Sequence, residues 1–173
     1  ETLMPHADAA VPEMMRFGTS IAMPKKYDNF RWYGRGPWEN YSDRKHSSFV
    51  GLYEGKVADQ YYPYIRPQES GNKTDVRWAE LTDKEGFGLK VTGEDLLNVS
   101  ALDVTPEALD PGTDKHNMHQ NDVWRDVWNV YLNVDFAQRG LGGDNSWGAA
   151  PHRPYILNPS NYSYTYFLTP VTK

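Results

Sequence analysis

Apolar and polar residues alternate along several stretches of the chain, and this pattern predicts β-strands. In the clearest stretch, 128–136, every second residue from Trp128 to Phe136 is apolar, while the residues between them are Asn, Tyr, Asn and Asp. A period of two residues is typical of a strand with one face in a core and the other toward water, as in antiparallel sheets. We therefore expect a half-buried antiparallel strand here.

Further strands are predicted on both sides of this stretch. Two alternating segments, 74–82 and 87–92, are joined by the turn residues 83–86, which indicates a hairpin. In its second arm Phe87, Leu89 and Val91 are expected to face the core. The remaining strands are expected at 16–22, 29–34, 96–104 and 162–168.

Glycine and proline mark where regular structure should stop. Two Gly and one Pro within residues 34–37 disfavour both helix and strand pairing, so we expect an irregular segment there and a compact loop through Arg44. A short helix is expected at 105–109, because Thr105 can cap it and Pro106 suits its first position. Together these elements predict an all-β fold, an antiparallel β-sandwich, with residues 1–15 as a tail or linker and 16–173 as one domain.

Length, charge and composition exclude several classes of protein. The 173 residues are too few for a complete eight-fold α/β barrel, which needs about 250. The 18 Lys and Arg against 23 Asp and Glu give a net charge of −5, and the basic residues do not cluster, so neither a nucleic acid nor a membrane is expected as a partner. With no Cys, the chain has no disulfide, thiolate zinc site or cysteine nucleophile.

Acidic and histidine side chains in irregular segments are the first candidates for chemistry. Glu39, Glu69 and Asp144 could form a glycosidase pair, which needs two carboxylates about 5–10 Å apart. Acids beside Gly and Pro more often accept hydrogen bonds from the backbone or from Arg, so we interpret these three as structural. His116 and His119 have an i, i+3 spacing but lack an acid at metalloenzyme spacing, so no metal site is expected.

A glycine-rich loop, 140–148, follows the best-defined strand and carries Trp147 near its end. A flat indole face suits the C–H face of a sugar, and the neighbouring Asp144, Asn145 and Ser146 suit its hydroxyl groups. The alternative is that Trp147 packs under its own loop as an anchor. The residues alone leave both interpretations open.

Four segments of the chain resemble, in this order, the bacterial β-galactosidases of glycoside hydrolase family two. They are GRGPWENYSDR at 34–44, YIRPQESGN at 64–72, DVRW at 75–78 and GLGGDNSW at 140–147. The resemblance covers residue 16 to the end of the chain. It is to the C-terminal small-chain domain of those enzymes, of which this chain would be the later part.

The resemblance implies a galactose-mutarotase-like supersandwich that follows the catalytic barrel of a complete enzyme acting on β-D-galactosides such as lactose. It places the catalytic residues, and the ligands of magnesium and of a monovalent cation, outside this chain. Within the chain it assigns Trp147, beside Asp144, Asn145 and Ser146, to a loop that stacks on the aglycone sugar. It also implies a structural framework, made by Gly36, Pro37, Glu39, Tyr41, Asp43, Arg44, Pro67, Glu69, Gly71, Arg77 and Trp78.

Within this framework the charged side chains are expected to satisfy one another, Glu39 and Asp43 with Arg44, and Glu69 with Arg77. The partners implied are the rest of the polypeptide with its barrel, the galactoside substrate, and further copies in a homo-oligomer, in a bacterial cytoplasm or periplasm. The isolated chain is then expected to be inactive.

Two other functions stay open from the sequence. One is an autonomous carbohydrate-binding module that uses exposed aromatic side chains. The other, by fold analogy, is an epimerase acting on a free aldose. An epimerase needs a general acid and a general base around a sugar ring, and the sequence offers no convincing His/Glu pair for this.

Overall fold

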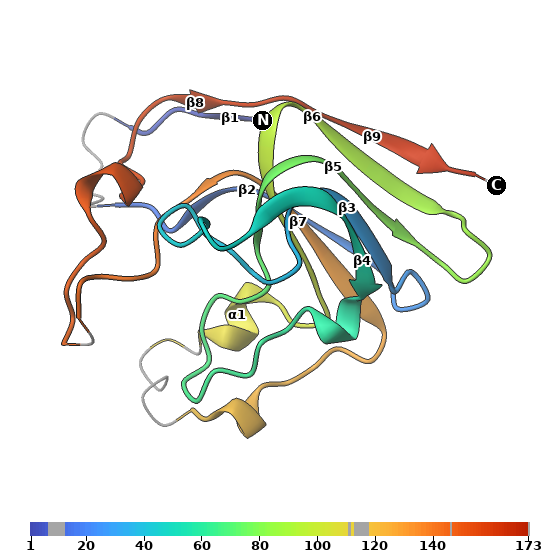
Figure 1. The fold of residues 1–173 in the computed structure, drawn as a ribbon, viewed down its shortest axis with the longest axis horizontal. Coiled ribbons are helices and arrows are strands. Elements are labelled where there is room, and N and C mark those ends of the chain that lie inside the picture. Colours follow the sequence, from blue (N-terminus) through green and yellow to red (C-terminus); the bar gives the residue numbers. More distant parts are fainter. Residues whose placement is uncertain (7–12, 111, 113–117, 146, 173) are drawn as a thin grey trace.

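The computed structural model describes residues 1–6, 13–110, 112, 118–145 and 147–172, and regular structure in them is mainly β-strand (Figure 1). The strands are β1 (Thr2–Leu3), β2 (Arg16–Pro24), β3 (Asn29–Gly36), β4 (Phe49–Lys56), β5 (Lys73–Thr82), β6 (Gly88–Leu102), β7 (Asn129–Gln138), β8 (Tyr162–Ser163) and β9 (Tyr166–Val171). The helices are the α-helix α1 (Pro106–Leu109) and the 3-10 helices η1 (Val57–Asp59), η3 (Gln120–Asp122) and η4 (Arg153–Tyr155).

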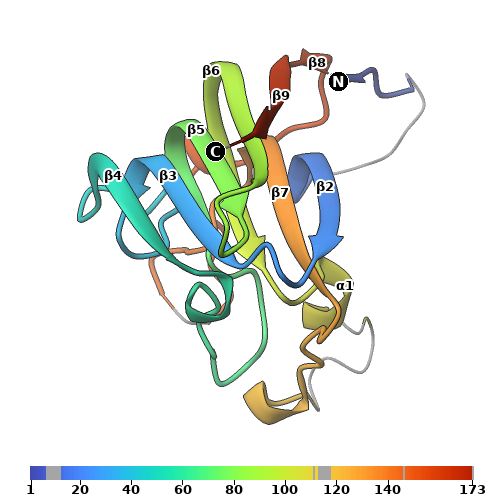
Figure 2. The same cartoon turned by 90° about the vertical axis from the view of Figure 1, so that its right-hand side faces the viewer.

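The longer strands pair antiparallel in a twisted sheet (Figure 2). Its order is β2-β7-β6-β5-β3-β4, and β9 pairs with the first part of β6. The strand β6 is 15 residues long, so it pairs with β5 on one side and with both β9 and β7 on the other. The predicted all-β, antiparallel fold is therefore confirmed.

The core is apolar and aromatic, and it is built from alternate residues of the central strands. Phe30 and Trp32 of β3 are buried, and their rings stack with centroids 4.8 Å apart. Leu81 and Leu132 are buried in the same cluster. Lys73 is also buried, with its Nζ 5.0 Å from the centroid of the Trp32 ring, and burial lowers the pKa of this lysine to about 8. The core thus holds one buried amino group beside an aromatic ring.

Most of the predicted strands and the predicted helix are present. The hairpin is formed by β5 and β6, and the segment predicted at 96–104 is the second part of β6. The segment predicted at 162–168 is broken into β8 and β9 at Tyr164, whose side chain is buried and whose hydroxyl donates to the carbonyl oxygen of Val134 (2.8 Å). At the start of α1, Thr105 Oγ1 accepts a hydrogen bond from the backbone N of Ala108 (3.2 Å), as a capping residue does.

The prediction of irregular structure at 34–37 is wrong for its first part. Gly34 to Gly36 extend β3 and pair with β4, and Pro37 follows through a cis peptide bond. Glycine allows close packing here, because a Cβ on Gly34 would lie 2.7 Å from Val76 Cγ2, and one on Gly36 would lie 2.7 Å from Tyr53 Cδ2. The strand β4 itself was not predicted.

The expectation that β7 has one face toward water is also wrong. Asn133 and Asp135, on its polar face, are buried. Asn133 Nδ2 donates to Ser100 Oγ (3.0 Å), and Asp135 is bound by Arg16. Hydrogen bonds therefore satisfy the polar groups that this side of the strand encloses.

The first residues of the chain lie beside residues near its end. Thr2 and Leu3 pair with Ser163 and Tyr162, and the N-terminal amino group donates to the carbonyl oxygen of Tyr164 (3.0 Å). The boundary at residue 15 between a tail and a domain stays a prediction.

Candidate functional site

The loop that carries Trp147 leaves the end of β7 and stands away from the sheet (Figure 1). The indole is 92% exposed, so it does not pack under its own loop. The backbone N of Trp147 donates to Asn145 Oδ1 (2.8 Å), and Asp144 Oδ1 lies 2.8 Å from His152 Nε2 on the surface. Ser146, predicted beside Trp147, lies outside the described residues.

Close contacts explain why this loop is rich in glycine. A Cβ on Gly140 would lie 2.8 Å from the Cβ of Tyr155 and 2.9 Å from the Cγ of Asp43. A Cβ on Gly143 would lie 2.0 Å from the carbonyl oxygen of Ala149. Larger residues at these two positions would push the loop away from its neighbours.

Asp43 reaches the Trp147 loop from the segment after β3. Its Oδ2 accepts a hydrogen bond from the backbone N of Gly142 (2.8 Å). On the other side, the backbone N of Gly140 donates to the carbonyl oxygen of Tyr155 (2.7 Å). The prediction that Asp43 pairs with Arg44 is therefore wrong, because the Asp43 carboxylate binds the backbone of the Trp147 loop.

Glu39 joins three segments near the same end of the sheet. Its Oε1 accepts hydrogen bonds from Arg44 Nη2 (2.8 Å) and from the hydroxyl of Tyr64, and its Oε2 accepts one from the backbone N of Gly71 (2.7 Å). The predicted pairing of Glu39 with Arg44 is therefore present. Gly71 has a φ of +77°, and a Cβ there would lie 2.8 Å from the carbonyl oxygen of Gln60, so glycine is required.

Asn40 fixes the segment after β3 to the start of β5. Its Oδ1 accepts hydrogen bonds from the backbone N (2.9 Å) and the hydroxyl (2.6 Å) of Thr74, and its backbone N donates to the carbonyl oxygen of Asn72 (2.8 Å). Both asparagines are buried. Tyr41, the next residue, is buried too, and burial raises the pKa of its hydroxyl well above the usual value.

The predicted pairing of Glu69 with Arg77 is wrong, because Glu69 pairs with Arg16. Arg16 donates from Nη1 to Glu69 Oε2 (3.3 Å) and from Nε to Asp135 Oδ1 (3.2 Å). Gln138 Nε2 also donates to Asp135 Oδ2 (2.7 Å). Burial raises the pKa of both carboxyl groups, to about 7 for Glu69, although the positive charge of Arg16 opposes this rise.

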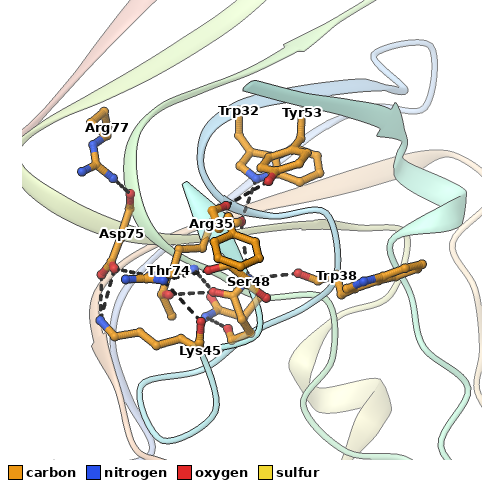
Figure 3. Close-up of polar contacts among 12 residues, drawn as sticks. Trp32, Arg35, Trp38, Lys45, Ser48, Tyr53, Thr74, Asp75 and Arg77 are labelled. Carbon is orange, nitrogen blue, oxygen red and sulfur yellow. Dashed lines mark hydrogen bonds and ion pairs between the residues drawn. The ribbon is translucent and has the colours of Figure 1, made fainter. Parts of the chain in front are cut away.

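Arg77 instead follows a bulge in β5, where it contacts Asp75 (Figure 3). Asp75 has a φ of 54°, and its carboxylate accepts hydrogen bonds from Arg35 Nε (2.5 Å) and Lys45 Nζ (2.9 Å). Burial alone would raise the pKa of Asp75, but these two cations hold it below its usual value. Arg77 Nη1 donates to the carbonyl oxygen of Asp75 (2.5 Å), and its guanidinium lies 5.3 Å from the centroid of the Tyr33 ring.

Trp78, the next framework residue, lies on β5, and its ring contacts one cation from each neighbouring strand, Lys90 of β6 and Arg31 of β3. Lys90 Nζ is 4.2 Å from the centroid of its ring, and the guanidinium of Arg31 is 5.6 Å away. Such contacts between a cation and an aromatic face are favourable at a surface. The framework role of Trp78 stays a prediction.

A cleft of about 690 Å³ opens beside the stem of the Trp147 loop. Pro67 and Glu69 line it, together with Gln138 at the end of β7 and with Arg139 and Leu141 at the start of the Trp147 loop. The segment around Pro67 and the base of the loop therefore share one cleft.

Neither a metal-binding cluster nor a membrane-spanning helix occurs in the described part of the chain. It holds no group of three or more His, Asp or Glu side chains that could bind a metal ion, so the ligands of the implied cations stay a prediction for the rest of the polypeptide. His119 lies before η3, where its backbone N donates to Asp122 Oδ2 (2.8 Å), and His116 is outside the described residues. None of the helices described is long and apolar enough to cross a membrane.

Several groups that fix the site were not singled out from the sequence. Arg16 lies 119 residues from Asp135, Asn40 lies 34 residues from Thr74, and Glu39 lies 25 residues from Tyr64. Asn40 and Tyr64 lie inside the motifs at 34–44 and 64–72, and this position in the sequence could have marked them as framework residues. Only the fold brings each pair together.

Comparison with known proteins identifies the family. A family model described as β-galactosidase small chain matches residues 2–168. The β-galactosidase of Priestia megaterium is 38% identical over 162 residues, which are 93% of this chain and 15% of that protein. The β-galactosidase of Lactobacillus delbrueckii subsp. bulgaricus is 38% identical over 144 residues, 82% of this chain and 13% of that protein. That of Vibrio cholerae is 33% identical over 154 residues, 89% of this chain and 14% of that protein.

The chain thus spans only 13% to 15% of the length of these curated relatives. The match nevertheless covers nearly all of the chain and includes both the framework motifs and the Trp147 loop. The chain belongs to the β-galactosidase small chain family.

Proposed function

We propose that this chain is a non-catalytic domain of a β-galactosidase, and that its Trp147 loop completes the side of the active site that holds the aglycone of substrates such as lactose. The observation that carries this proposal is the exposed indole of Trp147, on a loop that other segments hold in place. The relatives are named β-galactosidases, and the chain matches a small part of each. This supports a domain that works together with the rest of a longer polypeptide.

The chemistry of the loop suits one face of a pyranose ring. An indole contacts the C–H groups of a sugar and contributes both apolar burial and a preferred stacking geometry. The carboxylate of Asp144 and the ring of His152, both exposed, offer polar groups that can form hydrogen bonds with hydroxyl groups at the edge of such a sugar. The site would then recognise a sugar aglycone more strongly than a small aryl group.

A second candidate, the autonomous carbohydrate-binding module, draws support from further exposed aromatic side chains. Trp38 is 72% exposed and Tyr62 is 56% exposed, on segments other than the Trp147 loop. Figure 3 shows Trp38 directed away from the polar groups around Asp75. The two candidates differ in whether the isolated chain binds a galactoside by itself.

The experiment that tests the proposal is Trp147→Ala in the complete polypeptide. Loss of stacking should weaken aglycone binding by about 1–3 kcal/mol, the scale of an aromatic contact with its buried area. The loss should appear in KM for lactose and in transfer to a sugar acceptor. Breakdown of the galactosyl enzyme should stay nearly unchanged, because the aglycone has left by that step.

Comparing lactose with a small aryl galactoside decides the outcome. Trp38→Ala serves as a matched control, since it removes an exposed tryptophan from a different segment, and it should leave both KM values unchanged. Equal losses for both substrates in Trp147→Ala, together with a lower melting temperature, would show a structural role and contradict the proposal.

A further inference from the structure

We propose that Asp43 is a positioning residue for Trp147, and that it sets how well the loop receives a sugar aglycone. This inference rests on the proposed function of the Trp147 loop. Asp43 Oδ2 accepts the hydrogen bond from the backbone N of Gly142 (2.8 Å), although the two residues are 99 positions apart in the chain. A charged acceptor on a backbone N–H is among the stronger hydrogen bonds of a protein.

The segment that carries Asp43 is itself rigidly held. Asn40, three residues earlier, is buried and bonded to Thr74 of β5 through both the backbone N and the hydroxyl of that threonine. The Glu39 carboxylate accepts hydrogen bonds from the backbone N of Gly71 and from the side chain of Arg44. Asp43 therefore extends from a segment that is fastened to the main sheet, and it can transmit that rigidity to the loop.

The Trp147 loop, in contrast, gains no support from its own tryptophan. The indole is 92% exposed, so the direction of the ring depends on the backbone that carries it. That backbone is held at Gly142 by Asp43 and at Gly140 by the carbonyl oxygen of Tyr155 (2.7 Å). Asp144, which lies beside His152, is closer to Trp147 in sequence, but both groups of that contact are exposed. Removing the contact at Gly142 therefore takes away the support that links the loop to the segment after β3.

The fit between Asp43 and the loop is tight, which makes the contact specific. A Cβ on Gly140 would lie 2.9 Å from both the Cγ and the Oδ2 of Asp43, so the carboxylate packs against Gly140 and leaves no room for a side chain there. The other oxygen of Asp43, Oδ1, is buried and accepts no hydrogen bond within the part of the chain that the structure describes. Asparagine would keep an oxygen acceptor of the same size here, whereas alanine would not.

The experiment compares Asp43→Ala with Asp43→Asn in the complete polypeptide, using two readouts. Hydrogen exchange followed by mass spectrometry reports the order of residues 140–149 directly. Without the acceptor, these amides should exchange about tenfold faster in Asp43→Ala, since the net contribution of one hydrogen bond to a charged acceptor corresponds to about this factor. In Asp43→Asn exchange should stay within about twofold of wild type.

The second readout is the ratio of KM for lactose to KM for a small aryl galactoside. A less ordered Trp147 should raise this ratio about threefold to tenfold in Asp43→Ala, part of the loss expected for Trp147→Ala, and asparagine should restore it. Glu54→Ala removes an exposed acid from β4, so it controls for the change in charge and should alter neither readout.

Three results would count against the inference, and they have different meanings. Unchanged exchange in Asp43→Ala would show that Asp43 does not hold the loop. Faster exchange with an unchanged KM ratio, where Trp147→Ala does raise that ratio, would refute the positioning role alone. An unchanged ratio in Trp147→Ala itself would refute the proposed function, and with it the effect of Asp43 on aglycone binding.

Discussion

At the residue scale, Glu69 shows how a buried charge ties stability to pH. Its carboxylate shares Arg16 with Asp135, so one cation faces two acids, of which Asp135 is buried and Glu69 is partly exposed. Burial raises the pKa of Glu69 from 4.5 to about 7, and Asp135 and Glu39 add to this rise. The folded chain therefore keeps a proton on Glu69 at pH values where the unfolded chain has released it.

The first prediction follows from this difference. Between pH 4.5 and pH 7 the folded state binds more protons at Glu69, so this group makes the free energy of unfolding fall as pH rises through that window. Glu69→Gln removes the titration and keeps an acceptor for Arg16. At pH 8 the variant should be as stable as wild type or more stable, by up to about 3 kcal/mol, and the two should converge toward pH 5.

Urea-denaturation midpoints at pH 5 and pH 8 measure this effect. Glu54→Gln, on the exposed edge of β4, is the matched control and should leave the pH dependence unchanged. If Glu69→Gln lowers the midpoint more at pH 8 than at pH 5, the carboxylate is stabilising in its charged form and the prediction is wrong.

How much of the charged framework could be predicted depended on sequence separation. Glu39 and Arg44 lie in one loop, five residues apart, so their pairing was predicted from the motif and is present. Glu69 and Arg16 are 53 residues apart, and the nearer Arg77 was chosen instead. That choice failed because Arg77 lies after a bulge in β5, where it contacts Asp75 and Tyr33.

At the scale of elements, the joint between the segment after β3 and the start of β5 is held by buried polar groups. Asn40 Oδ1 accepts hydrogen bonds from the backbone N and the hydroxyl of Thr74. Its Nδ2 donates a hydrogen bond to the carbonyl oxygen of Trp38 (2.9 Å). A buried backbone N–H left without an acceptor costs more than the average hydrogen bond contributes. The stability of this joint should therefore depend on a single amide.

The prediction for this joint is a graded loss of stability. Asn40→Ala should lower the free energy of unfolding by about 2–4 kcal/mol, because it leaves the N–H and hydroxyl of Thr74 unpaired. Thr74→Val removes only the hydroxyl and should cost about 1 kcal/mol. Asn161→Ala changes an exposed asparagine and should be nearly neutral. Chemical denaturation of the three variants tests this order. An equal loss of stability in Asn40→Ala and Asn161→Ala would contradict the prediction.

Strand prediction succeeded where the alternation was long and failed where glycine or buried polar residues interrupted it. β7 and the β5–β6 hairpin had clear patterns, and both are present. β4 contains Gly51 and Gly55, which hide its period, and the structure pairs it with β3. The burial of Asn133 and Asp135 could not be predicted, because their partners come from other strands.

At the scale of the whole molecule, the acids considered for catalysis are engaged in structural contacts. Glu39 binds Arg44 and the backbone of Gly71, and Glu69 binds Arg16. Asp144 lies on the exposed Trp147 loop beside His152. Glycoside hydrolysis requires a pair of carboxylates in which one donates a proton and the other attacks or activates water. We therefore expect the isolated chain not to hydrolyse a β-galactoside.

Assays of the purified chain with lactose and with an aryl galactoside test this prediction. Turnover that disappears in Glu39→Gln or Glu69→Gln would contradict it. Lactose binding by the isolated chain should also be weak, because one aromatic contact hardly offsets the several kcal/mol lost on association. Micromolar affinity in calorimetry would favour the autonomous carbohydrate-binding module instead.

The burial of Asn40 and Asn72 has a practical consequence for producing the protein. Each begins an Asn-x-Ser/Thr tripeptide, the acceptor sequence for N-linked glycans, and both side chains are inaccessible in the folded chain. An oligosaccharide attached before folding would prevent the segment after β3 from closing onto β5. Asn161 begins another such tripeptide and is exposed. Passage through a eukaryotic secretory pathway should therefore yield folded chains that carry sugar at Asn161, while chains modified at Asn40 or Asn72 are retained as misfolded.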